Sequence, residues 1–332
     1  MEYELSFSAA DLAQTRFAVS PMWEVVTSYR ILRGDGAAAG PHRRWAEQVR
    51  PRLAEAGLDR GWLAELIPRT SYLADFLNPA PAAPFPTLAA ELDAIRRTAP
   101  DRVRVELDML AAQSGDRRPG PRLRLLREAP EAALEKVVAE IECYWELALA
   151  PYWARVRDVL EADVFHRARQ VAEHGAAHVL NELHETVSWD DGSLRLVRRH
   201  CRLTRDEAGA GLLLIPSAFA WPRVLTRSVP PEPPQLAYPA RGIGTLWEPR
   251  TTAAGEAVAA VIGRSRTLLL TELDTPASTT QLARHSGLSP AGVSQHLTAL
   301  RDAGLVTAHR AGRSVLYART AVADALLTAG AS

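Results

Sequence analysis

A predicted helix near the C-terminus has an apolar face and a polar face. Val293, Leu297 and Leu300 recur at helical spacing and are expected to point inward. The outward positions near the start of this helix are Ser289, Pro290, Ala291, Ser294, Gln295 and Thr298. Amide and hydroxyl groups such as those of Gln295 match the hydrogen-bonding pattern of base edges in the major groove of DNA. The chemistry expected of this face is therefore base recognition.

Two predicted helices and a tight turn position this face. Residues 279–286 form the first helix, in which the small Ala283 allows a second helix to cross closely. Gly287 supplies a turn residue that can adopt positive φ. Ser289 is a favourable N-cap, and Pro290 suits the first helical position. This spacing is typical of a helix-turn-helix, whose second helix enters the major groove with its N-terminal end.

A β-hairpin is predicted directly after these helices. Leu305-Val306 begins a strand, Ala311-Gly312-Arg313 forms a turn, and Val315–Ala318 returns. Arg310 and Arg313 would lie at the tip of the hairpin, where arginines suit phosphate or minor-groove contacts. We therefore include both arginines among the predicted DNA contacts.

Two further residues are candidate DNA contacts with an alternative interpretation. His296 either approaches a phosphate or packs at the edge of the helix. Arg301 either contacts DNA or forms an ion pair with Asp302 or Asp274. Both residues complete the predicted DNA-binding set.

Three segments of this region resemble the ArsR/SmtB-type winged-helix repressors. They are Val293-Ser294-Gln295-His296-Leu297, Leu300-Arg301-Asp302-Ala303-Gly304-Leu305-Val306 and Gly312-Arg313-Ser314-Val315-Leu316-Tyr317. The resemblance covers residues 251–329, about a quarter of the chain. It implies a winged helix that binds a palindromic operator in double-stranded DNA as a homodimer.

A second resemblance covers most of the preceding chain. Residues 211–222 and 238–242 resemble a domain of unknown function that is fused ahead of such winged helices in actinobacterial regulators. This resemblance implies no chemistry.

Metal sensing, a property of other members of the winged-helix family, does not carry over. The helix over 279–286 contains no cysteine, and residues 321–330 offer only Asp324. His174 and His178 are spaced like a metal-binding face, but a polar helix surface explains them more simply. We expect no metal, no cofactor and no catalytic residues.

Composition excludes several protein classes. The 332 residues include 39 basic and 39 acidic side chains, so the whole chain is not a polycation. Residues 262–319 carry seven arginines and three acidic residues, a net charge of +4 that suits DNA. Two cysteines are too few for a disulfide framework, and we find neither a signal peptide nor 18 consecutive apolar residues. We expect a cytoplasmic protein without a membrane partner.

The remaining chain predicts an α+β fold. Helical periodicity continues to about residue 181 and then gives way to short strands. We predict a helix-rich domain over residues 1–249 with a small antiparallel sheet, serving effector binding or dimerisation. A winged helix-turn-helix domain follows over residues 250–332.

Aromatic residues of the first domain suggest where an effector would bind. The candidates for binding a small molecule are Trp145, Trp189, Trp221 and Tyr238. Core packing is the favoured alternative for these side chains. We predict a transcriptional regulator, most simply a repressor gated by a small molecule. The alternative is an enzyme or metal-binding sensor domain with an appended regulatory winged helix.

Overall fold

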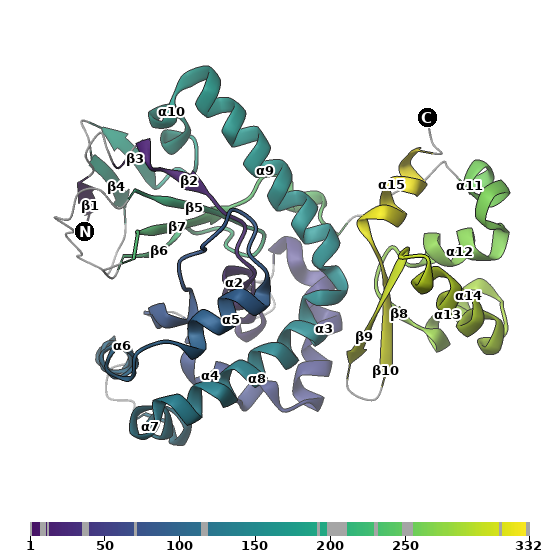
Figure 1. Ribbon diagram of the computed structural model, residues 1–332, viewed down its shortest axis with the longest axis horizontal. Helices are drawn as coiled ribbons and strands as arrows, with labels where there is room; N and C mark the ends of the chain where they lie inside the picture. Colours follow the sequence, from purple (N-terminus) through teal and green to yellow (C-terminus); the bar gives the residue numbers. More distant parts are fainter. Residues whose placement is uncertain are drawn as a thin grey trace. The chain divides into compact units, whose positions relative to one another are not determined.

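The computed structural model (Figure 1) describes residues 2–6, 11, 13–34, 40–69, 72–113, 119–190, 193–197, 211–228, 232–247, 255–311 and 314–329. The chain divides into two compact units. The sheet unit comprises residues 1–40, 60–140 and 159–243. The winged-helix unit comprises residues 41–59, 141–158 and 244–332. Two segments from the first half of the chain thus join the C-terminal region, and a functional boundary between residues 249 and 250 stays a prediction.

Most of the sheet unit is helical. Its helices are α2 (Pro21–Arg33), α4 (Trp62–Leu66), η3 (Asp75–Leu77), α5 (Leu88–Arg96), α6 (Pro100–Gln113), α7 (Pro121–Glu128), the first half of α8 (Pro130–Ala148), most of α9 (Trp153–His174) and α10 (Ala176–Asn181). Gly175, at φ 85°, separates α9 from α10. The α+β class is confirmed, with many helices and small sheets.

Two sheets belong to the sheet unit. Strands β1 (Glu2–Ser6), β4 (Ser193–Val197) and β3 (Val187–Asp190) form the antiparallel sheet. The other sheet has the order β2 (Arg16–Phe17), β5 (Leu213–Ser217), β7 (Gln235–Pro239), β6 (Leu225–Arg227). Its β2–β5 and β5–β7 pairs are parallel, which the strand pattern did not predict.

Helix α2 carries a carboxyl group in the core of the sheet unit. Glu24 is completely buried, and both of its carboxyl oxygens accept from the Ala218 backbone N–H, at 3.2 and 3.1 Å. Burial raises the pKa of Glu24 to about 8, although hydrogen bonds from Ser217, Ala218 and Phe219 oppose the shift. Burial likewise raises the pKa of Glu91 to about 7. These two groups favour the folded state when they are protonated.

The raised pKa of Glu24 predicts how stability depends on pH. Between about pH 5 and 7 the folded chain keeps this proton and the unfolded chain releases it. This one group therefore lowers the free energy of unfolding by about 1 kcal/mol for each pH unit gained. Urea unfolding of Glu24→Gln at pH 5, 6 and 7 should show a shallower decline than the wild type. The exposed Glu131→Gln variant should keep the wild-type slope; equal slopes in all three proteins would contradict the expectation.

The winged-helix unit contains the predicted C-terminal fold. In chain order its C-terminal elements are α11 (Gly255–Ile262), α12 (Arg264–Glu272), β8 (Ala277–Ser278), α13 (Thr279–Ser286), α14 (Pro290–Asp302), β9 (Val306–Ala311), β10 (Ser314–Arg319) and α15 (Ala321–Ala329). The strands form an antiparallel sheet in the order β8-β10-β9. This helix-turn-helix followed by a hairpin is a winged helix, as predicted.

Other segments complete the winged-helix unit. They are α3 (Arg43–Glu55), the end of α8, η4 (Ala150–Tyr152) and the start of α9. We call η4 and the adjoining ends of α8 and α9 the α8–α9 corner.

Among the described helices, none combines the length and the apolar character needed to cross a membrane.

Candidate nucleic-acid interface

Local capping interactions define the helix-turn-helix. Ser278 and Gln281 form a capping box at the start of α13. The helix ends at Gly287, whose φ of 70° lies in the left-handed region that glycine adopts without strain. The Ser289 hydroxyl then accepts from the Gly292 backbone N–H at 3.1 Å and caps α14. The predicted turn, N-cap and first helical residue are all confirmed.

Helix α14 has two faces of different character. Val293, Leu297 and Leu300 are buried in the core of the unit, as predicted. The exposed residues of the cap and of the first three turns of α14 are Ser289, Pro290, Ala291, Ser294, Gln295 and Thr298, and Arg301 and Asp302 are exposed at its C-terminal end. The Thr298 hydroxyl donates to the Ser294 carbonyl at 3.0 Å, so its oxygen stays available as an acceptor. One face therefore holds the helix in place, and the other presents hydrogen-bonding groups.

The remaining DNA-contact candidates have different surroundings. His296 is half-buried, between the two faces of the helix. Arg301 is exposed and lies 3.3 Å from the Asp302 carboxylate, so the predicted alternative of pairing with Asp302 occurs. Arg310 is exposed on β9. Arg313 lies outside the described residues, and DNA contact by all of these residues stays a prediction.

Asp274, the other alternative partner of Arg301, forms a different ion pair. The Arg319 guanidinium, 5% exposed, donates to Asp274 Oδ1 at 3.0 Å and lies 3.0 Å from Asp324 Oδ1. It also donates to the Leu270 carbonyl at 3.2 Å. This cluster joins α12, β10 and α15, and sequence reasoning missed it. The only indication in the sequence was Arg319, a charged residue at the end of an otherwise apolar strand.

The four effector candidates occupy different surroundings. Trp145 is buried in the winged-helix unit, with its ring 4.9 Å from that of Trp153. In the sheet unit, Tyr238 is buried in the core against which Trp189 packs. Its hydroxyl donates to Asp163 at 2.7 Å, and burial raises the pKa of Tyr238 well above its usual range. Trp221 is 45% exposed. Effector binding at these positions stays a prediction.

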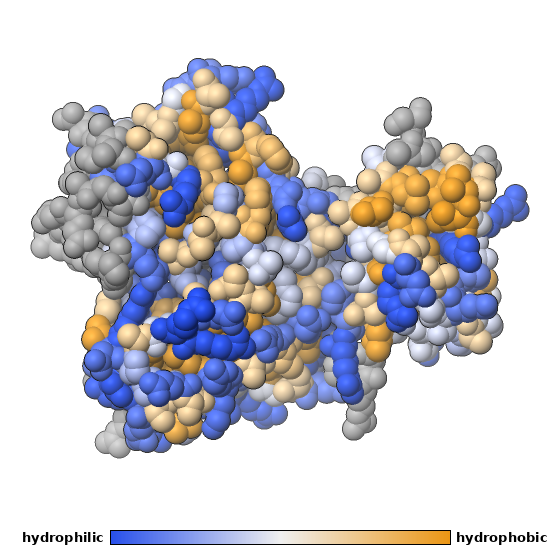
Figure 2. All heavy atoms as spheres, viewed as in Figure 1, coloured by the Kyte–Doolittle hydropathy of each residue, from blue (hydrophilic) through white to orange (hydrophobic). Residues whose placement is uncertain are grey.

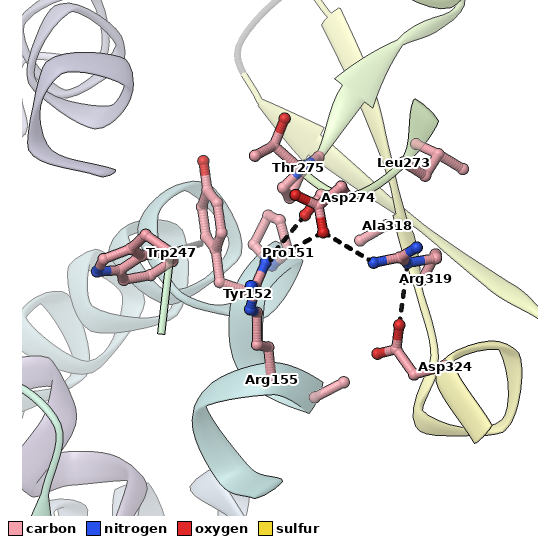
Figure 3. A pocket seen from close by; sticks show the side chains of 12 residues that line it. Pro151, Tyr152, Arg155, Trp247, Leu273, Asp274, Thr275, Ala318, Arg319 and Asp324 are labelled. Carbon is pink, nitrogen blue, oxygen red and sulfur yellow. Dashed lines mark hydrogen bonds and ion pairs between the residues drawn. The ribbon is translucent and has the colours of Figure 1, made fainter. Parts of the chain in front are cut away.

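A small cavity lies between the wing and the α8–α9 corner (Figure 3). Its volume is about 30 Å³. It is lined by Pro151, Tyr152, Ala154, Arg155, Trp247, Leu273, Asp274, Thr275, Pro276, Ala318, Arg319 and Asp324. That volume suits about two water molecules, whereas pockets for drug-sized ligands measure roughly 300 Å³ or more. The cavity is therefore too small to hold a drug-sized effector.

The histidine pair and the cysteines do not form a larger cluster in the described part of the chain. The rings of His174 and His178 are 4.8 Å apart, and His174 Nε2 lies 3.9 Å from Glu173. Among the described residues, no three histidine, cysteine or acidic side chains come together in a way that could hold a metal ion. Cys143 is exposed on α8, and Cys201 lies outside the described residues.

The fold and the exposed face of α14 define a winged-helix nucleic-acid-binding protein. Residues 267–308 match the family described as bacterial regulatory protein, arsR family. Residues 98–244 match a family of unknown function, DUF5937. Neither the curated proteins nor the solved structures contain a match to the chain. An arsR-family helix-turn-helix thus follows a domain of unknown function, which confirms both resemblances and supports a DNA-binding transcriptional regulator.

Proposed function

We propose that this protein is a sequence-specific repressor that binds a palindromic operator as a homodimer in the cytoplasm. The observation that carries the proposal is the N-capped helix α14, whose exposed face presents Ser294 and Gln295. Recognition helices read bases from this N-terminal end. The exposed Arg310 on the wing supports a backbone contact alongside.

Fluorescence anisotropy with the full-length chain tests this function. Binding to labelled duplexes of genomic sequence should weaken steeply between 50 and 200 mM salt, because phosphate contacts release counterions. A small set of duplexes should bind at least about a thousandfold more tightly than the rest at equal salt. Absence of binding across genomic fragments would contradict the proposal.

An exposed apolar surface supports the homodimer. Val261 on α11 is 79% exposed, Val322 on α15 is 63% exposed, and Leu268 on α12 is 39% exposed. Helices α11 and α15 pack against each other, and Figure 2 shows hydrophobic side chains gathered over them. A second copy of the chain on this surface would cover it. It would also supply the second recognition helix, which palindromic sites place about 34–36 Å away.

Charge placed on this surface should break the dimer. Val322→Glu would bury a carboxylate at the interface, so we expect the dimer dissociation constant to rise at least about a hundredfold. Sedimentation velocity measures the change. Val105→Glu makes the same substitution at a 58% exposed valine of α6 and should leave the dimer intact. A Val322→Glu protein that stays dimeric would place the interface elsewhere.

Gating by a small-molecule effector is the second part of the proposed function. The sheet unit is too large for a linker, and an effector that favours one dimer geometry would change DNA affinity. A thermal-shift screen of metabolites and antibiotics against the full-length chain tests this. A ligand that raises the melting temperature and changes operator affinity would support gating. Within the described residues, no observation favours an enzyme or a metal sensor over this function.

A further inference from the structure

The sheet of the winged helix is covered on both faces. Val306 and Tyr317 pack in the core of the winged helix. Leu316 and Ala318 flank Tyr317 along β10 and point to the opposite face, yet they are only 2% and 3% exposed. Strands β9 and β10 both lie against η4 of the α8–α9 corner. The corner therefore covers a face that an isolated winged helix would expose.

Two polar contacts join the corner to the winged helix. Arg155 of α9 donates to the Asp274 backbone carbonyl at 3.2 Å, and its guanidinium lies 3.5 Å from the Asp274 carboxylate (Figure 3). Glu146 of α8 lies 3.2 Å from His309 Nδ1. His309 occupies β9 directly before Arg310, the candidate backbone contact. The first contact reaches the turn after α12, where Asp274 also pairs with Arg319 of β10. The second contact reaches β9, the strand that leads to the wing tip.

The corner itself is held by α3 and Trp247. The Trp45 indole donates to the Ala148 carbonyl at 2.9 Å, and the Tyr152 hydroxyl donates to Gln48 at 2.8 Å. Trp247 stacks on Trp45 with ring centroids 6.3 Å apart and meets Tyr152 edge-on at 5.4 Å. Trp45 is buried, as are Tyr152 and Trp247. Aromatic packing with satisfied polar groups makes the corner a firm support.

We propose that the α8–α9 corner is a wing support that sets DNA affinity by holding β9 and β10 in their DNA-binding arrangement. This inference rests on the proposed DNA-binding function. A wing ordered before binding loses less conformational entropy on the DNA. Helices α8 and α9 continue from the corner into the sheet unit. The corner lies within residues 98–244, so part of the domain of unknown function packs against the wing and acts on DNA affinity through it.

Two substitutions in the full-length chain release the support. Arg155→Ala removes the contact with Asp274, and Glu146→Ala removes the acceptor opposite His309 at a 53% exposed position. The matched controls are Arg169→Ala and Glu131→Ala, which make the same changes at exposed positions of α9 and α8. Hydrogen exchange without DNA should quicken in residues 306–319 of the two release variants and stay at the wild-type rate in the controls.

Operator affinity in a double-mutant cycle then tests whether the wing support controls DNA binding. Arg155→Ala should weaken binding about fivefold, and this loss should be smaller when Arg310→Ala is already present, because the support acts through the wing. The wing support would be overturned if the hydrogen-exchange rate of the wing or the operator affinity stayed unchanged in Arg155→Ala. It would also be overturned if Arg155→Ala weakened binding equally with and without Arg310. In each of these cases the proposed function would stand. A wild-type chain that binds no DNA would instead overturn the proposed function and the control of affinity with it.

Discussion

Replacing Gln295 by alanine is expected to lower operator affinity by about 10- to 100-fold while leaving non-specific DNA affinity almost unchanged. An amide that forms two hydrogen bonds with a base discriminates by about 1–3 kcal/mol, and each 1.4 kcal/mol corresponds to a factor of ten. Gln295 is exposed in the second turn of α14 after its capped N-terminus. Its loss should therefore relax sequence preference at the base pairs it reads.

Fluorescence anisotropy at fixed salt, on an operator duplex and on a scrambled duplex, measures this effect. Arg310→Ala should weaken both complexes to a similar degree, because a phosphate contact carries no sequence information. Gln113→Ala makes the same change as Gln295→Ala on the exposed surface of α6 and should alter neither complex. If Gln295→Ala weakened both duplexes equally, the assignment of Gln295 to base reading would be wrong.

Replacing Arg319 by alanine is expected to destabilise the winged helix by about 3–5 kcal/mol. The substitution removes a buried cation and leaves the Asp274 and Asp324 carboxylates, 21% and 12% exposed, without that partner. Removing one member of a buried ion pair costs this much because the remaining charge stays desolvated. It also removes the hydrogen bond to the Leu270 carbonyl.

Hydrogen exchange of β10 and α15 reports the local free energy of opening and so measures this loss. The matched control is Arg301→Ala, which breaks an ion pair whose arginine and aspartate are 50% and 65% exposed. Exposed pairs contribute about 0–1 kcal/mol, so this control should remain close to the wild type. Similar losses of stability in the two variants would show that the buried ion pairs of Arg319 stabilise the fold no more than the exposed pair of Arg301.

The helix-turn-helix was predictable because its determinants are local. Gly287, Ser289 and Pro290 each act on a neighbouring backbone group, and their spacing fixes where one helix stops and the next begins. The periodic Val293 and Leu297 identify the buried face without knowledge of any partner. The exposed face follows by exclusion, so most of the candidate site could be predicted from one short segment.

Long-range features were beyond the same reasoning. The β5–β7 pairing is parallel and joins strands whose order along the chain does not reveal their neighbours. Trp45 and Trp247 are about two hundred residues apart in sequence, yet their rings stack. Likewise Arg155 meets Asp274 only because α9 folds beside the winged helix within one unit. Such contacts depend on tertiary packing, which residue spacing does not encode.

Selection of bound duplexes from a random DNA pool by the full-length chain tests the central claim most directly. If α14 reads the major groove from a homodimer, the selected sequences should share a two-fold symmetric motif with half-sites about 10 base pairs apart. The same selection with Gln295→Ala should yield a motif that is degenerate at one position of each half-site. A pool that remains random after repeated selection, or an identical motif for both proteins, would contradict base recognition through this helix.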